Sequence, residues 1–378
     1  MISYDNFKDL FMEEVKNQLE DAGIDAKISL NTVKKLNDTY EAMTVTPEGE
    51  SIGVNIPISK FYDAYDEGMS VEEAVSRAVD LITQGFEEKP DINLDELSDY
   101  SVMKEKLAME VVSAETNKEM LETIPHKMME DMAVVYRFVL NSDEDGRSSI
   151  LVTNKMIENF GITAEELHAD AMENAPQLKP VEIKGMSEVL AELMGVEQAE
   201  MMGVGPVAPE DEQMYVATVP DKVHGAGVLA YENFMDMAAE RAGGDFFILP
   251  SSLHEVLIVP DNGNVKLEDL ENMVKEVNAT QVAPQDKLTD SVYHYDSKEK
   301  IFELGEKFVE RQNQKENAKD VSDKKPIVSD LVLKEDKASE PPKKKSVLGD
   351  LKAKKEEIAK TPKKAMDKGV KVKDGKEI

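Results

Sequence analysis

The apolar residues of this chain recur with a helical period in some segments and alternate as in strands in others, which predicts a mixed α+β protein. Residues 3–22 place apolar side chains at helical spacing before Gly23, so we predict a first helix there. Short alternating segments within residues 26–58 predict an antiparallel meander, and a second helical apolar face follows Ser70. We therefore predict a small N-terminal α+β unit (helix, short strands, helix) over residues 1–86.

An acidic stretch interrupted by Pro90, residues 87–105, is predicted to connect this unit to a main α+β domain over residues 106–311. Residues 132–140 give the clearest strand pattern of the main domain. Residues 106–113 form a short apolar run that fits a helix or a strand equally.

The clearest helix start is Thr163, because Glu166 follows it by three residues in the pattern of a capping box. Residues 176–212 are irregular, rich in methionine and interrupted by Pro and Gly, and they contain one predicted short helix at residues 186–193.

A central hairpin is predicted at residues 245–260, where two runs of β-forming residues, 246–249 and 256–259, are joined by a polar connection. That connection, Pro250 to Glu255, gathers two hydroxyls, an imidazole and a carboxylate at one tip.

Residues 312–378 are rich in lysine and nearly free of aromatic residues, so we predict a disordered C-terminal tail. The predicted fold class is thus α+β: a mixed, mostly antiparallel sheet flanked by helices, with a smaller N-terminal α+β unit and this tail.

The charge of the chain is divided unevenly. Residues 312–378 hold 19 Lys and 13 Asp or Glu, whereas residues 1–311 hold 26 Lys or Arg and 64 Asp or Glu. So acidic a body repels phosphate backbones, which makes nucleic acid an unlikely partner for it. We recognise no signal peptide and no apolar run long enough to span a membrane, so we expect a cytoplasmic protein with no membrane contact.

Residues and motifs that the chain lacks exclude several kinds of catalytic and binding site. The chain has no cysteine, which excludes disulfides, thiolate zinc sites and cysteine nucleophiles. His254-Glu255 lacks the second histidine of a zincin helix, and His224-Gly225-Ala226-Gly227 lacks the third glycine and the lysine of a phosphate loop. The acidic loop at residues 143–146 lacks the ligand pattern of a calcium loop. We therefore predict no cofactor.

The remaining candidates are side chains without a specifying motif. For catalysis they are the residues of the hairpin tip, His254, Glu255, Ser251 and Ser252. For a metal they are three histidines from separate segments, His126, His254 and His294. The alternative for all of them is an ordinary role in turns, since a Ser and a His so close along one turn lack the third group of a triad.

Four stretches carry a resemblance to a known family. They are residues 117–136, residues 161–174 with their capping box, the central string from Ile248 to Val256 that contains Pro-Ser-Ser-Leu-His-Glu, and Val292 to Asp296. Together they resemble the uncharacterised domain-of-unknown-function family 5688, over about residues 1–300. A fainter similarity points to the uncharacterised family 1444. The resemblance implies a bacterial protein of Firmicutes, often encoded on mobile elements, and it brings no activity or catalytic residue with it.

These observations favour a non-enzymatic cytoplasmic protein that acts by binding a macromolecule, with an accessory role on a mobile element implied by the resemblance alone. An unknown protein partner is expected, with the tail at residues 312–378 as one means of docking. The alternative is a hydrolase-like enzyme with its site at the tip from Pro250 to Glu255. A third possibility is mimicry of nucleic acid by the acidic body.

Overall fold

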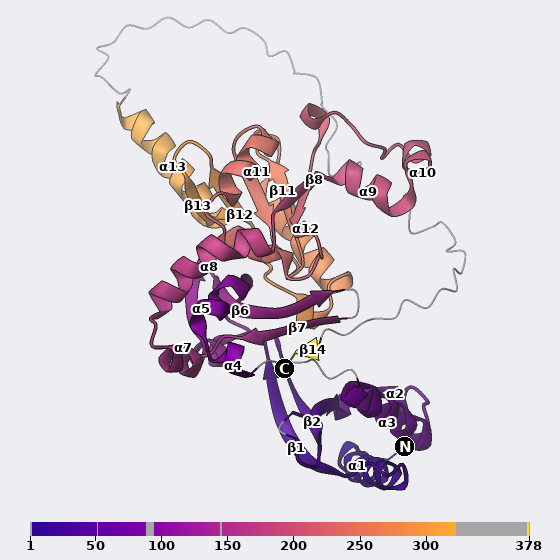
Figure 1. Ribbon diagram of the computed structural model, residues 1–378. Helices are drawn as coiled ribbons and strands as arrows, with labels where there is room; N and C mark the ends of the chain where they lie inside the picture. Colours follow the sequence, from indigo (N-terminus) through magenta and orange to yellow (C-terminus); the bar gives the residue numbers. More distant parts are fainter. Residues whose placement is uncertain (1, 51, 88–93, 144–145, 323–375, 378) are drawn as a thin grey trace, which may run out of the picture.

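The computed structural model describes residues 2–50, 52–87, 94–143, 146–322 and 376–377 and has the predicted α+β class (Figure 1). Its strands form three sheets with almost entirely antiparallel pairing. No helix in the described residues is long and apolar enough to cross a membrane.

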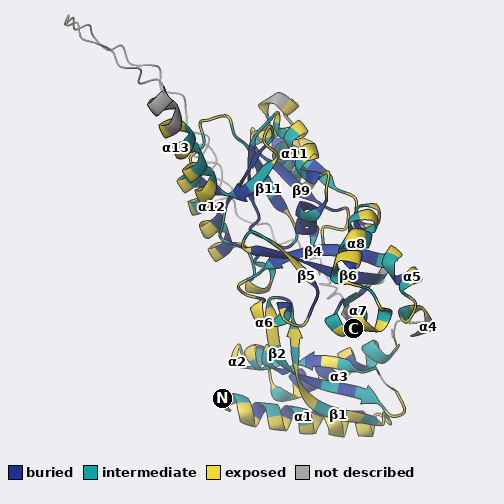
Figure 2. Cartoon of the chain, turned by 90° about the vertical axis from the view of Figure 1, so that its left-hand side faces the viewer, coloured by how far each residue is buried: buried dark blue, intermediate teal, exposed yellow. Residues whose placement is uncertain are grey.

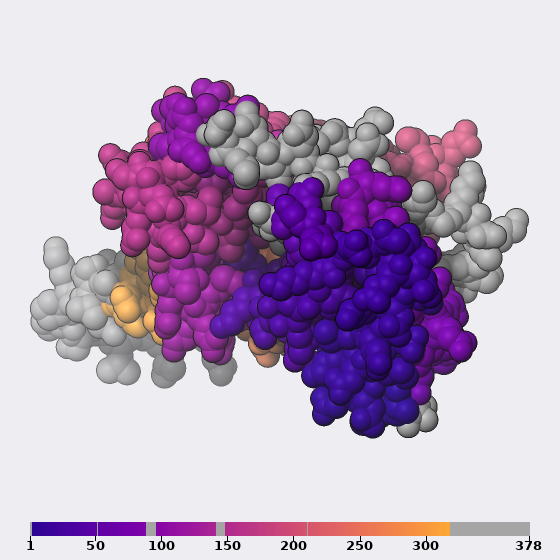
Figure 3. Space-filling model, turned by 60° about the horizontal axis from the view of Figure 1, so that its bottom comes forward, coloured from indigo at the N-terminus to yellow at the C-terminus, as the bar shows by residue number. Residues whose placement is uncertain are grey.

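The N-terminal elements surround one small sheet with three helices. The sheet contains β1 (Ala26–Lys35), β2 (Asp38–Pro47) and β3 (Val54–Pro57), and the helices are α1 (Tyr4–Asp21), α2 (Ile58–Asp66) and α3 (Val71–Glu87). Ser3 accepts a hydrogen bond from the Asn6 amide and so caps α1, which buries Phe7 and Phe11 against the other helices. Because these elements share one apolar core, they form a lobe of their own, indigo in Figure 3.

The β1–β2 hairpin is longer than the sequence pattern predicts, and its tip reaches the rest of the molecule (Figure 1). Asn37 occupies the turn with a φ of 62°, a left-handed conformation that Asn tolerates. The backbone amide of Asn37 donates to Oδ1 of Asn117 at 2.7 Å, and Nδ2 of Asn117 donates back to Oδ1 of Asn37 at 2.6 Å. Leu36 packs into the core of the main body. The lobe is thus held by its hairpin tip.

A five-stranded sheet forms one half of the main body. It contains β4 (Leu107–Ser113), β5 (His126–Met129), β6 (Met132–Asp143), β7 (Gly146–Leu151) and β14 (Lys376–Glu377). β6 pairs with β4 along one edge, and along the other with β5 and then β7. The short elements around this sheet are α4 (Leu94–Leu97), α5 (Tyr100–Met103), η1 (Lys104–Lys106), α6 (Lys118–Leu121) and α7 (Asn154–Phe160).

A six-stranded antiparallel sheet forms the other half. Its order is β13 (Ile301–Leu304), β12 (Tyr293–Asp296), β10 (Phe246–Leu249), β11 (Val256–Pro260), β9 (Tyr215–Thr218) and β8 (Glu182–Gly185). The predicted hairpin lies at its centre, with Phe246 opposite Pro260 and Leu249 opposite Leu257. Figure 2 shows that β9 and β11 are mostly buried, as are β4 and β6 of the other sheet.

The remaining helices flank the two sheets or project from them. They are α8 (Ala164–Leu178), α9 (Met186–Met194), α10 (Val196–Met201), α11 (Phe234–Ala242), α12 (Leu267–Thr280) and α13 (Gly305–Ser322), with η2 (Pro209–Asp211) and η4 (Pro284–Asp286) in the connections. α8 begins with the predicted capping box, since Thr163 Oγ1 accepts from the Glu166 amide and the Glu166 carboxylate accepts from the Thr163 amide.

The two sheets meet across η3 (Gly225–Ala230), whose backbone lies against both. A Cβ on Gly227 would lie 2.2 Å from the carbonyl oxygen of Met109 on β4. A Cβ on Gly225 would lie 2.2 Å from Oγ1 of Thr218 and 2.3 Å from the carbonyl oxygen of His254. The two glycines that resemble part of a phosphate loop therefore allow backbones to approach each other closely.

The structure refines several local predictions. Residues 106–113, which fit either element, form strand β4 from Leu107 onward, because the run pairs with β6 along its edge and is buried on both faces, with α8 and η3 packed against it. The predicted connector at residues 87–105 contains α4 and α5, and residues 88–93 of it lie outside the described residues. The predicted start of the tail at residue 312 falls inside α13. Most of residues 312–378 lie outside the described residues.

Removing the side chain of Asn117 tests whether the hairpin tip is anchored by its amide pair. Asn117→Ala loses the bonds to Asn37 and a 2.9 Å bond to the Ser113 carbonyl, so we expect the free energy of unfolding to fall by about 1–3 kcal/mol. Asn31→Ala, which removes an exposed side-chain amide from the same hairpin, should change the free energy of unfolding by about 0.5 kcal/mol at most. Equal effects in urea titrations would contradict this role of Asn117.

A methyl group at Gly227 tests the close approach of η3 to β4. Gly227→Ala should lower the free energy of unfolding by about 1–3 kcal/mol, because the backbone of Met109 cannot move without distorting β4. Ala230→Gly, which changes one methyl group at the end of the same turn without a clash, serves as the control. Thermal unfolding with no loss of stability in Gly227→Ala would show that the two sheets are not held at this separation.

Candidate functional site

The predicted catalytic residues at the hairpin tip lie beside a group of charged and imidazole side chains where the two sheets meet. We call this group the sheet junction; it comprises Glu110, Arg137, Lys179, Asp221, His224, His254 and Asp286. The strands, α8 and the turns around η3 each contribute at least one member.

The innermost part of the sheet junction is an ion pair between neighbouring strands. Arg137 Nε on β6 donates to Oε2 of Glu110 on β4 at 2.9 Å, and both side chains are almost fully buried. Arg137 Nη1 also donates to Ser149 Oγ on β7 at 3.3 Å. Burial by itself raises the pKa of Glu110, but the charges of Arg137, His224 and Lys179 outweigh it and lower the pKa to about 2. Glu110 is therefore a fixed negative charge in the interior.

The turn before η3 is held over this ion pair by two basic side chains. His224 adopts a left-handed conformation with a φ of 54°, which brings its Nδ1 to 3.7 Å from Glu110 Oε1. Lys179, at the end of α8, donates from Nζ to the carbonyl of Val223 at 2.9 Å and lies 3.4 Å from Asp221 Oδ2. The contacts of His224 and Lys179 thus hold the backbone of the turn in place.

His254 has a neighbour at each ring nitrogen. The amide of His224 donates to Nδ1 at 3.3 Å, so Nδ1 is unprotonated and the proton of the neutral ring lies on Nε2. Nε2 is 3.4 Å from Oδ1 of Asp286 on η4. The ring of His254 is partly exposed and its centroid is 5.7 Å from that of His224. With both nitrogens directed at other groups, His254 has no ring nitrogen left to activate a hydroxyl in this arrangement.

The other predicted catalytic residues are engaged in the turn itself. Ser252 Oγ accepts a hydrogen bond from the amide of His254 at 3.0 Å, and the carbonyl of nearly buried Ser251 accepts from the Leu288 amide at 3.1 Å. Glu255 is exposed at the start of β11. The structure thus brings His254 to an acidic partner, Asp286, that sequence reasoning did not identify, and it places both serines in backbone contacts.

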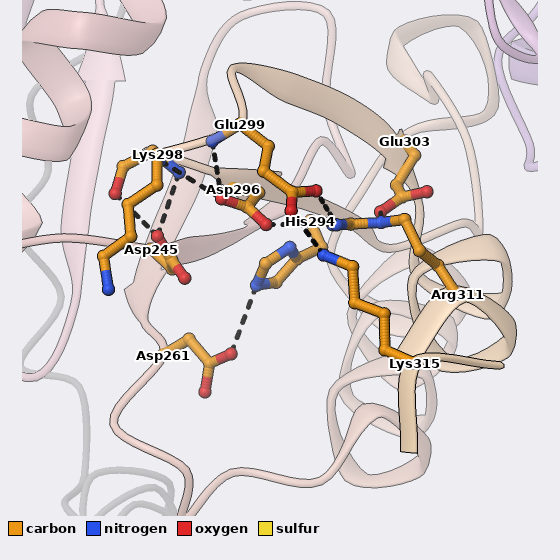
Figure 4. Close-up of polar contacts among 10 residues, drawn as sticks. Asp245, Asp261, His294, Asp296, Lys298, Glu299, Glu303, Arg311 and Lys315 are labelled. Atoms are coloured by element: carbon orange, nitrogen blue, oxygen red, sulfur yellow. Dashed lines mark hydrogen bonds and ion pairs between the residues drawn. The ribbon is translucent and has the colours of Figure 1, made fainter. Parts of the chain in front are cut away.

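The three histidines predicted as metal ligands have different surroundings. His126 lies on β5 and is exposed, with Nδ1 3.1 Å from the carbonyl of Ile124. His294 lies on β12, almost fully buried, with Nε2 3.2 Å from Oδ2 of Asp261 (Figure 4). Its ring stacks on Phe308. Within the described ranges no three His, Asp or Glu side chains are grouped so as to hold a metal ion. The predicted set does not assemble because His126 lies on the five-stranded sheet, whereas His254 precedes β11 and His294 contacts Asp261 after the end of β11.

His294 lies beside an ion-pair network that fastens α13 to the six-stranded sheet (Figure 4). Arg311 donates to Glu303 at 2.7 Å, to Asp296 at 3.1 Å and to Glu299 at 2.5 Å, and Lys315 reaches Glu299 at 2.6 Å. Sequence reasoning missed this network, because its members are scattered over β12, β13 and α13. It explains why the helix continues past residue 312.

The two described cavities lie away from the sheet junction. One, of about 430 Å³, lies between the β1–β2 hairpin tip and the segment from Glu115 to Met120. The other, of about 550 Å³, is lined by Tyr215, Arg241 and Pro260 among others. Neither of these two cavities is lined by His254 or Glu110.

A second candidate site is a surface. Residues 186–212, which we call the acidic arm, contain α9, α10 and η2 and extend from the end of β8 (Figure 1, upper right). The arm has seven acidic and no basic residues, and four of its large apolar side chains are more than 45% exposed: Leu193 (73%), Val196 (53%), Met201 (82%) and Val207 (49%). In the sequence, the methionine-rich composition of residues 176–212 could have indicated this surface, but it does not show which side chains are exposed.

The acidic arm is nevertheless a folded element. Glu212 Oε2 accepts from Ser187 Oγ at 2.6 Å, and Ser187 Oγ in turn accepts from the Val207 amide at 3.3 Å, which joins the two ends of the arm. Lys184 on β8 donates to Glu192 at 2.6 Å. The exposed apolar side chains are therefore presented on a defined backbone.

The chain belongs to the family of unknown function DUF5688, which matches residues 4–297 and confirms the resemblance predicted from the sequence. The match includes most of the two sheets, the sheet junction and the acidic arm, and it ends before β13, α13 and β14. No curated protein and no solved structure matches the chain.

The depressed pKa of Glu110 predicts a pH dependence of stability. The folded-state pKa of about 2 lies below the ordinary glutamate value of 4.5, so the stabilisation is present above pH 4.5 and is lost as the pH falls toward 2. Glu110→Gln should be less stable than the unmodified protein at pH 7, and this difference in unfolding free energy should shrink as the pH falls through that window. Urea titrations of both proteins at several pH values measure this difference in unfolding free energy. A difference that does not vary with pH would contradict a charged Glu110.

Proposed function

We propose that this chain is a non-enzymatic cytoplasmic protein that acts by binding a macromolecular partner, and that the acidic arm is its binding surface. The observation that supports this most is the exposure of Leu193, Val196, Met201 and Val207 on a short, folded projection. An accessory role on a mobile element is part of the proposal on the family resemblance alone.

The exposure of these side chains is costly unless something covers them. Burying a side chain of this size contributes about 1.5–3 kcal/mol, and clustered exposed apolar residues are typical of interaction sites. Methionine side chains adapt to different partner surfaces because they are unbranched and polarisable. The seven carboxylates of the arm favour a partner with basic residues around an apolar centre.

The alternatives find less support. A hydrolase at the tip from Pro250 to Glu255 needs a free imidazole nitrogen beside a hydroxyl, whereas His254 directs its nitrogens to the His224 amide and Asp286. Direct binding of nucleic acid by the body is opposed by its 64 acidic against 26 basic residues over residues 1–311. Mimicry of nucleic acid uses charge without apolar contact and does not account for the arm.

A paired substitution on the acidic arm tests the proposal. Leu193→Ser with Met201→Ser removes the two most exposed apolar side chains, so we expect partners recovered from cells of the source bacterium to be lost or strongly reduced, with thermal stability unchanged. Leu81→Ser, at a 49% exposed position on α3, is the matched control and should retain them. If the arm variant captures the same partners in the same amounts, the arm is not the binding surface.

A further inference from the structure

The chain itself contains a segment whose chemistry complements the acidic arm. Residues 343–355 read Lys-Lys-Lys-Ser-Val-Leu-Gly-Asp-Leu-Lys-Ala-Lys-Lys, with six lysines, one aspartate and three large apolar residues. This is the densest basic stretch of a chain whose net charge is −32. It combines basic residues with an apolar centre, the two features that the arm favours in a partner.

Charge alone does not select the acidic arm, because acidic residues outnumber basic ones over the whole of residues 1–311. What distinguishes the arm is that four exposed apolar side chains lie among its seven acidic residues along the sequence. Glu197 and Glu200 are exposed on α10 beside Val196 and Met201. Lysines that flank Val347, Leu348 and Leu351 fit this arrangement, since the apolar groups meet while the charges pair at the rim.

We propose that residues 343–355 bind the acidic arm of the same molecule. This inference rests on the proposed function of the arm as a binding surface, and it adds that the lysine-rich segment covers the arm until a partner displaces it. The contact is thus autoinhibitory: partner and segment compete for the same apolar side chains.

The length of chain after α13 permits this contact. Residues 323–342 separate Ser322 from Lys343 and span at most about 70 Å when fully extended. A body of roughly 300 residues has a diameter of about 50 Å, so the segment reaches the arm from the end of α13. Tethering also keeps the segment at a high effective concentration, on the order of millimolar for a short connection.

The absence of cysteine from the sequence allows a single reporter to be placed in the segment. In the full chain, Ser346→Cys carries a nitroxide spin label, and methionine methyl groups carry ¹³C. We expect the label to broaden the NMR signal of Met201 severalfold at low salt, and not that of Met128, a 54% exposed methionine on β5. In about 1 M salt, where the Debye length is about 3 Å, the broadening should decrease strongly.

A matched variant separates specific docking from general attraction. Leu348→Ser with Leu351→Ser keeps every charge of the segment but removes its apolar centre, so the broadening of Met201 should be lost. No broadening of Met201 at low salt, equal broadening of Met128, or broadening that persists in this variant would each overturn the proposal.

Mixing distinguishes the chain's own segment from that of a second copy. Spin-labelled protein without ¹³C is combined with ¹³C-labelled protein that carries no spin label. Broadening of Met201 in this mixture alone would overturn binding within one molecule and assign the contact to a second copy. If the segment fails to bind while Leu193→Ser with Met201→Ser still loses its partners, the further inference is wrong and the proposed function stands. If that variant keeps its partners, the proposed function itself fails.

Discussion

The close approach of η3 to both sheets is the constraint on which the main body depends. Gly227 lies against the backbone of β4, and Gly225 lies against Thr218 and the carbonyl of His254, so no side chain fits at either position. The Ala226 amide donates to the Leu253 carbonyl at 3.0 Å, which ties the same turn to the central hairpin. The turn thus contacts both the five-stranded and the six-stranded sheet, whose buried side chains share one apolar core.

The sheet junction follows from that constraint. Two sheets that meet around a turn leave polar backbone and side-chain groups in the interior, and buried charges require partners there. Glu110 and Arg137 pair across neighbouring strands, while His224, Lys179 and Asp221 fix the turn above them. A group of acids, bases and imidazoles in one place resembles a catalytic site, yet its hydrogen bonds are directed at the protein's own backbone and at each other. These contacts fix how the two sheets meet, and the surface that we propose for binding other molecules is the acidic arm at the end of β8.

The sequence predicts the elements that depend on neighbouring residues, and it does not predict those that depend on partners distant along the chain. The capping box at Thr163, the hairpin around His254 and the strand at residues 132–140 depend on neighbours along the chain, and the structure contains all three. The short strands β5 and β8 exist only because β6 and β9 pair with them, and four residues carry too little periodicity to be recognised alone. The partners of Glu110 lie 27 residues or more away along the sequence, so no local pattern points to this ion pair. The role of Gly225 and Gly227 is likewise set by strands that are distant along the chain.

Photo-crosslinking through methionine tests most directly whether the acidic arm carries the binding function. Cells of the source organism grown with photo-methionine incorporate a reactive diazirine at methionines throughout the chain, and mass spectrometry identifies which positions join to a partner. Our account predicts crosslinks at Met194, Met201 and Met202 of the arm, since Met201 is 82% exposed. Partner crosslinks at Met128 or Met237, which are 54% and 42% exposed outside the arm, with none on the arm, would contradict it.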